Sequence, residues 1–117
     1  MIRLKRVYAE PAPGDGMRIL VERLWPRGLS KDKAAIDWWH KEIAPSAELR
    51  KWYAHDVDKW PEFGRRYRAE LDRNPDAVAE LTQRMGKKKV TFVFAAHDEA
   101  HNSAVVLKDY LERQRKS

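Results

Sequence analysis

Residues 90–96, VTFVFAA, constrain the fold more than any other segment of the chain. The run is apolar on both of its sides and rich in residues that favour strands. A strand that faces water on one side alternates apolar and polar residues, whereas an unbroken apolar run is typical of a strand covered on both faces. We therefore predict an α/β fold in which a small, mostly parallel sheet is flanked by helices.

Two further strands are expected near the amino terminus, at residues 2–8 and 18–24. The segment EPAPGDG between them holds two prolines and two glycines, which favour a loop. In the second strand Arg23 shares one side with Ile19 and Val21 and lies at the carboxyl end. Residues 37–44, DWWHKEIA, fit either a strand or a continuing helix, and we favour the strand.

Helices account for most of the remaining chain. Ser30 is suited to cap a short helix, and the Asn74-Pro75 pair separates two longer ones. The expected helices begin at about Lys31, after Pro45-Ser46, near Trp60, at Pro75 or Asp76, and at about Glu99, the last ending near Arg113. The helical block before Val90 supplies the crossover that parallel strands require.

The composition fits a single domain spanning residues 1–117. The chain has no cysteine, and its first residues lack the apolar core of a signal peptide. No run approaches the roughly 18 apolar residues of a membrane span, so we expect a cytoplasmic protein without membrane contact. The net charge of +6 favours anionic partners, but the basic residues are scattered, as on a solvated surface. The oligomeric state is not defined by this pattern.

A candidate ligand site follows from the two strands that carry polar residues at their ends. Ligands of α/β sheets gather outside the carboxyl ends of the strands. Arg23 and Arg27 follow one strand, and Asp98, His101 and Asn102 follow another. Guanidinium groups match phosphate and carboxylate, and a helix amino terminus also favours anions. We expect a pocket for a small anionic ligand, phosphorylated or nucleotide-like, with Arg23, Arg27 and Asn102 as binding residues.

Each of these residues also has a purely structural explanation. Arg23 could pair with an acidic residue such as Asp37, and Arg27 could simply be exposed beside Gly28. The carboxylate of Asp98 could cap the N–H of residue 100 or 101. The sequence does not decide between these structural roles and ligand binding.

Two histidines are candidates for acid/base chemistry, and we name His101, Asp98 and His55 as candidate catalytic residues. In the first turn of a helix the dipole disfavours a protonated His101, and a neutral imidazole can both donate and accept a hydrogen bond. Asp98 and Asn102 would orient His101 or the ligand. His55 and Asp56 form a second pair, with Asp56 as a candidate ligand-binding residue, although capping of the adjoining helices explains them as well.

Other chemistries have little support. His97 and His101 are four residues apart, but His97 belongs to the turn before the helix, and no third metal ligand is evident, so we predict no metal site. The serines do not lie in a Gly-x-Ser-x-Gly elbow. The glycines are spread out and form no phosphate-binding loop, and we predict no cofactor.

Four motifs resemble the YeaO-like family of small bacterial proteins of unknown function: RVYAEPAPGDG-x-R-x-LVERLWPRG at 6–28, LRKWYAHD at 49–56, Phe63-x3-Tyr67-x3-Leu71, and AA-x-D-x2-HN-x-A from Ala95. The resemblance implies an α/β domain in a bacterial cytoplasm and no established activity. Two residues depart from the family pattern: Glu22 stands where Asp is commoner, and His97 stands where Lys is usual. The second departure argues further against a metal site.

The sequence thus leaves two functions open. The first is a protein that binds a small anionic molecule and could be an enzyme of undefined reaction, with His101 as acid or base. The second is a noncatalytic module that binds nucleic acid or a protein through its basic surface.

Overall fold

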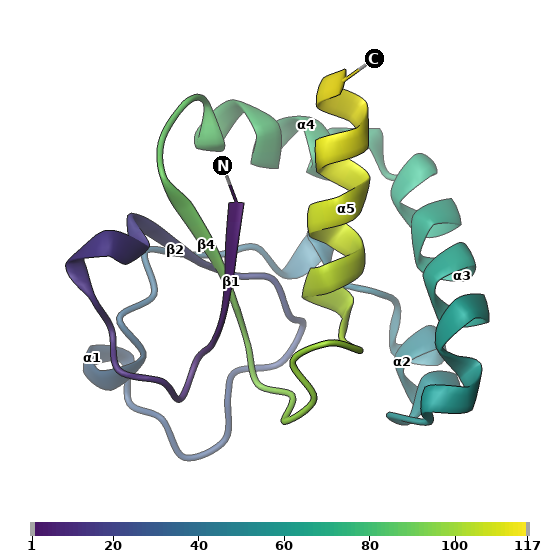
Figure 1. Ribbon diagram of the computed structural model, residues 1–117, viewed down its shortest axis with the longest axis horizontal. Helices are drawn as coiled ribbons and strands as arrows, with labels where there is room; N and C mark the ends of the chain where they lie inside the picture. The colour runs from purple at the N-terminus through teal and green to yellow at the C-terminus, as the bar shows by residue number, and fades with distance from the viewer. Residues whose placement is uncertain (1, 117) are drawn as a thin grey trace.

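The computed structural model describes residues 2–116 and shows a four-stranded sheet in the order β1-β4-β2-β3. The strands are β1 (Ile2–Arg6), β2 (Met17–Leu20), β3 (Trp38–Trp39) and β4 (Val90–Phe94), and every neighbouring pair is parallel. All five residues of β4 are buried. The prediction that this segment forms a central strand of a parallel α/β sheet is therefore confirmed (Figure 1).

Five α-helices and three short 3-10 helices complete the described chain. The α-helices are α1 (Lys31–Ala34), α2 (Ala47–Tyr53), α3 (Trp60–Asp72), α4 (Pro75–Met85) and α5 (Ser103–Lys116), and the 3-10 helices are η1 (Pro13–Asp15), η2 (Lys41–Ile43) and η3 (Val57–Lys59). None of the helices within residues 2–116 is long and apolar enough to span a membrane.

The two faces of the sheet are covered unequally. Phe92 and Ile19 belong to a large core that includes apolar side chains of α2, α3, α4 and α5. Val93 and Leu20 point to the opposite face, where they pack with Ala34 of α1 and with the loops on either side of that short helix. Figure 1 shows α2, α3 and α5 on one side of the sheet and α1 on the other.

A buried ion pair stabilises the face of the sheet that is covered by α1 and its neighbouring loops. Arg18 on β2 is 4% exposed, and its guanidinium donates hydrogen bonds to the carbonyls of Ala34 (2.9 Å) and Ala35 (3.1 Å) at the end of α1. The same guanidinium lies 2.7 Å from the carboxylate of Asp15, which also accepts a bond from Lys5 Nζ at 3.1 Å. This network links β1, η1, β2 and α1.

Three of the boundaries that differ from the sequence-based prediction bear on the site. The second strand ends at Leu20 rather than residue 24, so Arg23 lies in the following loop and not in the sheet. Residues 37–44 contribute only Trp38–Trp39 to the sheet before η2 begins, so the favoured longer strand was wrong. The closing helix begins at Ser103 rather than near Glu99, because a turn built on Asp98 precedes it.

Candidate functional site

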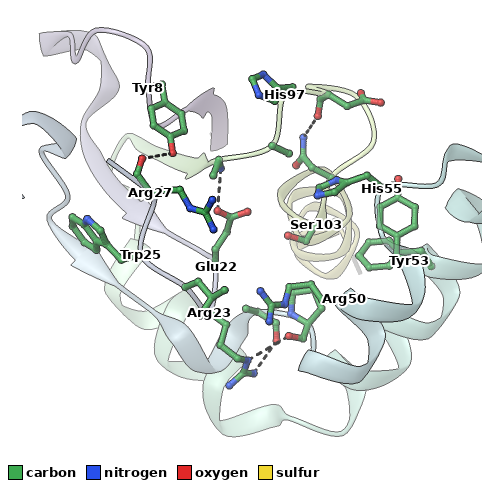
Figure 2. Close-up of a pocket in the computed structure, with 18 residues that line it drawn as sticks. Tyr8, Glu22, Arg23, Trp25, Arg27, Arg50, Tyr53, His55, His97 and Ser103 are labelled. Carbon is green, nitrogen blue, oxygen red and sulfur yellow. Dashed lines mark hydrogen bonds between the residues drawn. The ribbon is translucent and has the colours of Figure 1, made fainter. Parts of the chain in front are cut away.

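A cavity of about 810 Å³ opens beyond the carboxyl ends of β2 and β4. Its walls come from the loop after β2, the segment Ala44-Pro45, helix α2, the loop after β4 and the first residue of α5 (Figure 2). The size falls in the range of small-molecule sites. Of the residues predicted from sequence, Arg23, Arg27, His55, Asp98 and Asn102 line this cavity, whereas Asp56 and His101 do not.

Arg23 is held at the floor of the cavity by backbone oxygens. Its Nε lies 3.5 Å from the carbonyl of Pro45, and its terminal nitrogen lies 3.4 Å from that of Ala44. Both hydrogen bonds are long. No hydrogen bond or ion pair joins Arg23 to Asp37 in the described structure, and the Asp37 carboxylate instead accepts the backbone N–H of Arg18 at 2.9 Å.

Arg27 presents a free guanidinium to the same cavity. The residue is exposed, and its side chain has no hydrogen bond or ion pair among the described residues. Its backbone is fixed nonetheless, because the hydroxyl of Tyr8 donates to the Arg27 carbonyl at 2.8 Å. The loop is thus anchored while its cationic side chain remains available.

Arg50 is a cavity residue that the sequence analysis missed. It lies on α2, and its Nε is buried without a hydrogen-bond partner. No other bond to its guanidinium occurs within residues 2–116. The signal was present in the helical spacing, because Arg50 precedes the inward-facing Tyr53 by three residues and so shares its side of the helix.

Glu22 is the second missed residue, and it places a carboxylate among these cations. One of its oxygens accepts the backbone N–H of Ala95 at 3.0 Å, and its own carbonyl accepts the indole N–H of Trp39 at 2.7 Å. Burial raises the pKa of the Glu22 carboxyl, although the Ala95 hydrogen bond and the charge of Arg50 act in the opposite direction. Because β2 ends at Leu20, the Glu22 side chain is free to turn toward the cavity.

Asp98 organises the turn that precedes α5. Its carboxylate accepts hydrogen bonds from the backbone N–H groups of Ala100 (2.9 Å) and His101 (3.0 Å) and lies 2.9 Å from Nδ1 of the His101 ring. These bonds, from Ala100 first and the His101 side chain next, hold the pKa of Asp98 below its usual value. The capping explanation for Asp98 is therefore confirmed, and the residue lines the cavity as well.

Asn102 is the amino-terminal cap of α5. Its Oδ1 accepts the backbone N–H of Val105 at 3.2 Å, and its amide donates to the carbonyl of Asp98 at 2.9 Å. The first turn of α5 therefore begins at the cavity wall, where Ser103 is also exposed to the cavity. The expected convergence of a helix amino terminus with the arginines is seen in this arrangement.

His101 does not line the cavity, although it contacts residues that do. Its ring stands edge-on to Trp60 with the ring centres 5.2 Å apart, and its carbonyl accepts the hydroxyl of Tyr53 at 3.0 Å. Tyr53 and Asp98 stand at the wall itself. The expectation that His101 belongs to the first turn of the helix was wrong, since it precedes the cap residue.

The two residues of the His55-Asp56 pair have different roles: one lines the cavity and the other caps a helix. His55 follows α2 with a φ of 59° and lines the cavity. Asp56 instead accepts the backbone N–H of Asp58 at 3.1 Å and caps η3, as its structural explanation predicted. His97, an exposed residue after β4, adds another imidazole to the rim.

Aromatic side chains complete the cavity wall. Tyr8, Trp25, Tyr53 and Phe63 all border it. Burial raises the pKa of the Tyr53 hydroxyl, and the nearby carboxylates of Asp98 and Asp56 raise it further. A neutral Tyr53 donor fits its observed bond to His101. The cavity thus combines cations, the carboxylates of Glu22 and Asp98, and apolar ring surface.

Comparison with known proteins places the chain in a family. A family model described as "Inactive DUF488-N3 subclade" matches residues 1–117. The uncharacterised protein Rv3073c of Mycobacterium tuberculosis is 43% identical over 110 residues, which cover 94% of this chain and 92% of that protein. The uncharacterised protein YeaO of Escherichia coli is 42% identical over 110 residues, covering 94% of this chain and 96% of YeaO. No solved structure matches significantly. The chain therefore belongs to the YeaO-like DUF488 family, within the group described as the inactive DUF488-N3 subclade.

Proposed function

We propose that the cavity binds a small molecule that carries a phosphate or carboxylate group. The observation that carries this proposal is the pair of unpartnered guanidiniums, those of Arg27 and Arg50, which face one ligand-sized cavity from different elements. Guanidinium groups form their strongest hydrogen bonds with carboxylate and phosphate, often in bidentate geometry.

The energetics of Arg50 favour an anionic occupant. A buried donor without a partner costs on the order of 1–3 kcal/mol. An oxyanion beside Arg50 would supply the missing acceptor for the buried Nε and would neutralise charge that is partly removed from water. The first turn of α5 has backbone N–H groups without intrahelical acceptors, which adds positive potential at the opposite wall.

Binding without turnover is the form of this proposal that the site supports best. The DUF488-N3 subclade, to which the chain belongs, is described as inactive. His101, which we predicted as acid or base, does not line the cavity, although its bonding partners Tyr53 and Asp98 do. The catalytic assignments of His101, Asp98 and His55 stay predictions, and ligand binding does not depend on them.

The alternative of a nucleic-acid surface has weaker support. Several basic residues outside the cavity have local partners: Arg65 and Arg66 pair with Glu62, and Arg84 stacks on the ring of Trp38 at 4.2 Å. Such contacts are typical of a solvated helical surface. Among the described residues, Arg27 and Arg50 are cationic side chains without hydrogen-bond or ion-pair partners that line one cavity.

A thermal-shift titration at constant ionic strength tests the proposal. Phenyl phosphate should raise the melting temperature of the unaltered protein in a saturable way, since a ligand at 100 times its Kd stabilises the folded state by about 2.7 kcal/mol. Arg50→Gln and Arg27→Gln should each raise the phenyl phosphate concentration that gives half of the maximal shift at least tenfold.

The control is Arg73→Gln, which removes the same charge from an exposed residue at the far end of α3. It should keep the full response. The proposal would be overturned by a melting temperature that no phosphate or carboxylate raises, or by a response that Arg50→Gln and Arg73→Gln reduce equally.

A further inference from the structure

We propose that Glu22 makes the cavity selective for anions that also carry a hydroxyl or ammonium group close to the acidic group. This inference rests on the proposed binding of an anion and concerns the chemical class of that ligand. It begins from a carboxylate placed where a site for simple anions would have none. Figure 2 shows Glu22 between the Arg27 side of the cavity and the start of α5 at Ser103.

One contact holds the Glu22 carboxylate and a second holds the Glu22 backbone. The N–H of Ala95, the residue after β4, binds one carboxylate oxygen at 3.0 Å. The indole N–H of Trp39, the last residue of β3, donates to the Glu22 backbone carbonyl at 2.7 Å. A carboxylate that is bonded directly and carried on an anchored backbone is preorganised, which is the property of a group that determines ligand orientation.

The same carboxylate is incompletely satisfied. An ionised carboxylate offers about four acceptor positions, and the Ala95 N–H uses one of them. No ion pair involves Glu22 within the part of the chain that the structure describes, although Arg23, Arg27 and Arg50 line the same cavity. Partial burial makes this arrangement costly in the absence of a donor.

Selectivity follows from the sign of the charges. An anion without a donor group would be attracted by the arginines but repelled by Glu22. A ligand whose hydroxyl or ammonium group reaches Glu22 while its acidic group reaches Arg27 or Arg50 would satisfy both. A site built to accept a ligand hydrogen bond rejects analogues that lack the donor, because its own polar group is then left unpaired.

Isothermal titration calorimetry with three matched probes tests this inference. Ethyl phosphate, 2-hydroxyethyl phosphate and 2-aminoethyl phosphate differ only at the terminal carbon, so they separate the anion from the donor. The unaltered protein should bind at least one of the two donor-bearing probes about tenfold more tightly than ethyl phosphate. Comparison of those two probes identifies whether the donor is a hydroxyl or an ammonium group.

Glu22→Gln keeps an oxygen for the Ala95 N–H and removes the charge. It should bind ethyl phosphate more tightly than the unaltered protein does, and it should lose most of the preference for whichever donor-bearing probe the unaltered protein favours. Glu48→Gln, at an exposed residue of α2 outside the cavity, is the control and should leave all three affinities unchanged.

The possible failures are distinguishable. If none of the probes binds, the proposed anion site itself is wrong. If all three bind the unaltered protein equally, the anion site stands and the role of Glu22 is overturned, whether or not the Glu22→Gln protein folds. Equal effects of Glu22→Gln and Glu48→Gln would also overturn it.

Discussion

At the scale of single residues, the most consequential buried contact is the pair of Asp15 and Arg18. Both are nearly inaccessible, at 5% and 4% exposure. Burial alone would raise the pKa of Asp15, but hydrogen bonds from the Ala12 N–H, Lys5 and Arg18 outweigh it and hold that pKa below its usual value. Asp15 is therefore ionised in the folded protein and neutralises a buried guanidinium.

Asp15→Ala should lower the free energy of unfolding by about 3–5 kcal/mol, because it leaves Arg18 buried without its counter-charge. Urea denaturation at neutral pH measures this loss, with the exposed Glu80→Gln on α4 as control. Because the pKa of Asp15 is lowered by folding, its contribution is complete above the ordinary Asp value and is lost as pH falls through the folded-state pKa. A loss below about 1 kcal/mol, or one that persists unchanged in strong acid, would contradict this account.

Residue roles that depend only on local spacing could be predicted from the sequence. The cap at Asp56 and the bonds of Asp98 to the N–H groups of residues 100 and 101 follow from short side chains that accept nearby backbone N–H groups, and both were anticipated as alternatives. Arg50 and Glu22 were missed for different reasons. Arg50 could have been found as the polar residue on an otherwise apolar face of α2. The position of Glu22 at the cavity could not be predicted without knowing that β2 ends at Leu20.

At the scale of elements, the boundaries were the least predictable feature. The strand predicted from the sequence extends from residue 18 to 24, but pairing with β4 ends at Leu20↔Val93. Beyond that point side chains replace the backbone ladder, since Glu22 binds the N–H of Ala95 and Trp39 binds the carbonyl of Glu22. Such substitutions depend on residues distant in sequence and cannot be inferred from local periodicity.

The turn before β2 depends on glycine at one position. Gly16 has a φ of +66°, and a Cβ there would lie 2.6 Å from Cβ of Lys89 and would overlap the Lys89 carbonyl. That carbonyl accepts the N–H of Met17 at 2.9 Å. The segments around Gly16 and Lys89 therefore cannot move apart without breaking the bond that begins the β2–β4 pairing. Gly16 is thus required both by conformation and by close approach.

Gly16→Ala should lower the free energy of unfolding by about 2 kcal/mol or more, from a strained backbone and a steric overlap. Gly14→Ala is a matched control two residues away, because a Cβ there meets only the flexible end of Arg3 at 3.6 Å. Urea titrations of both variants measure the difference. Equal stabilities would show that the turn does not constrain the sheet in this way.

At the scale of the whole molecule, the site exists because the sheet brings together segments that are far apart in sequence. The loop after β2 and the loop after β4 become neighbours because β2 and β4 pair in parallel, so both carboxyl ends lie at one edge. The buried character of residues 90–96 predicted this arrangement. The sequence could not show that α2 would close the cavity with Arg50, because helix placement depends on packing against the large core.

The central claim is that the cavity, and not the basic surface in general, binds an oxyanion. NMR titration of the folded protein with phenyl phosphate tests this claim most directly, by observing the arginine Nε–H signals and the backbone amides at constant ionic strength. We predict saturable shifts for Arg50, Arg27 and the amides of residues 102–104, with a common dissociation constant, and no comparable shift for Arg73. Shifts that do not saturate, or that spread equally over the exposed arginines, would contradict the account.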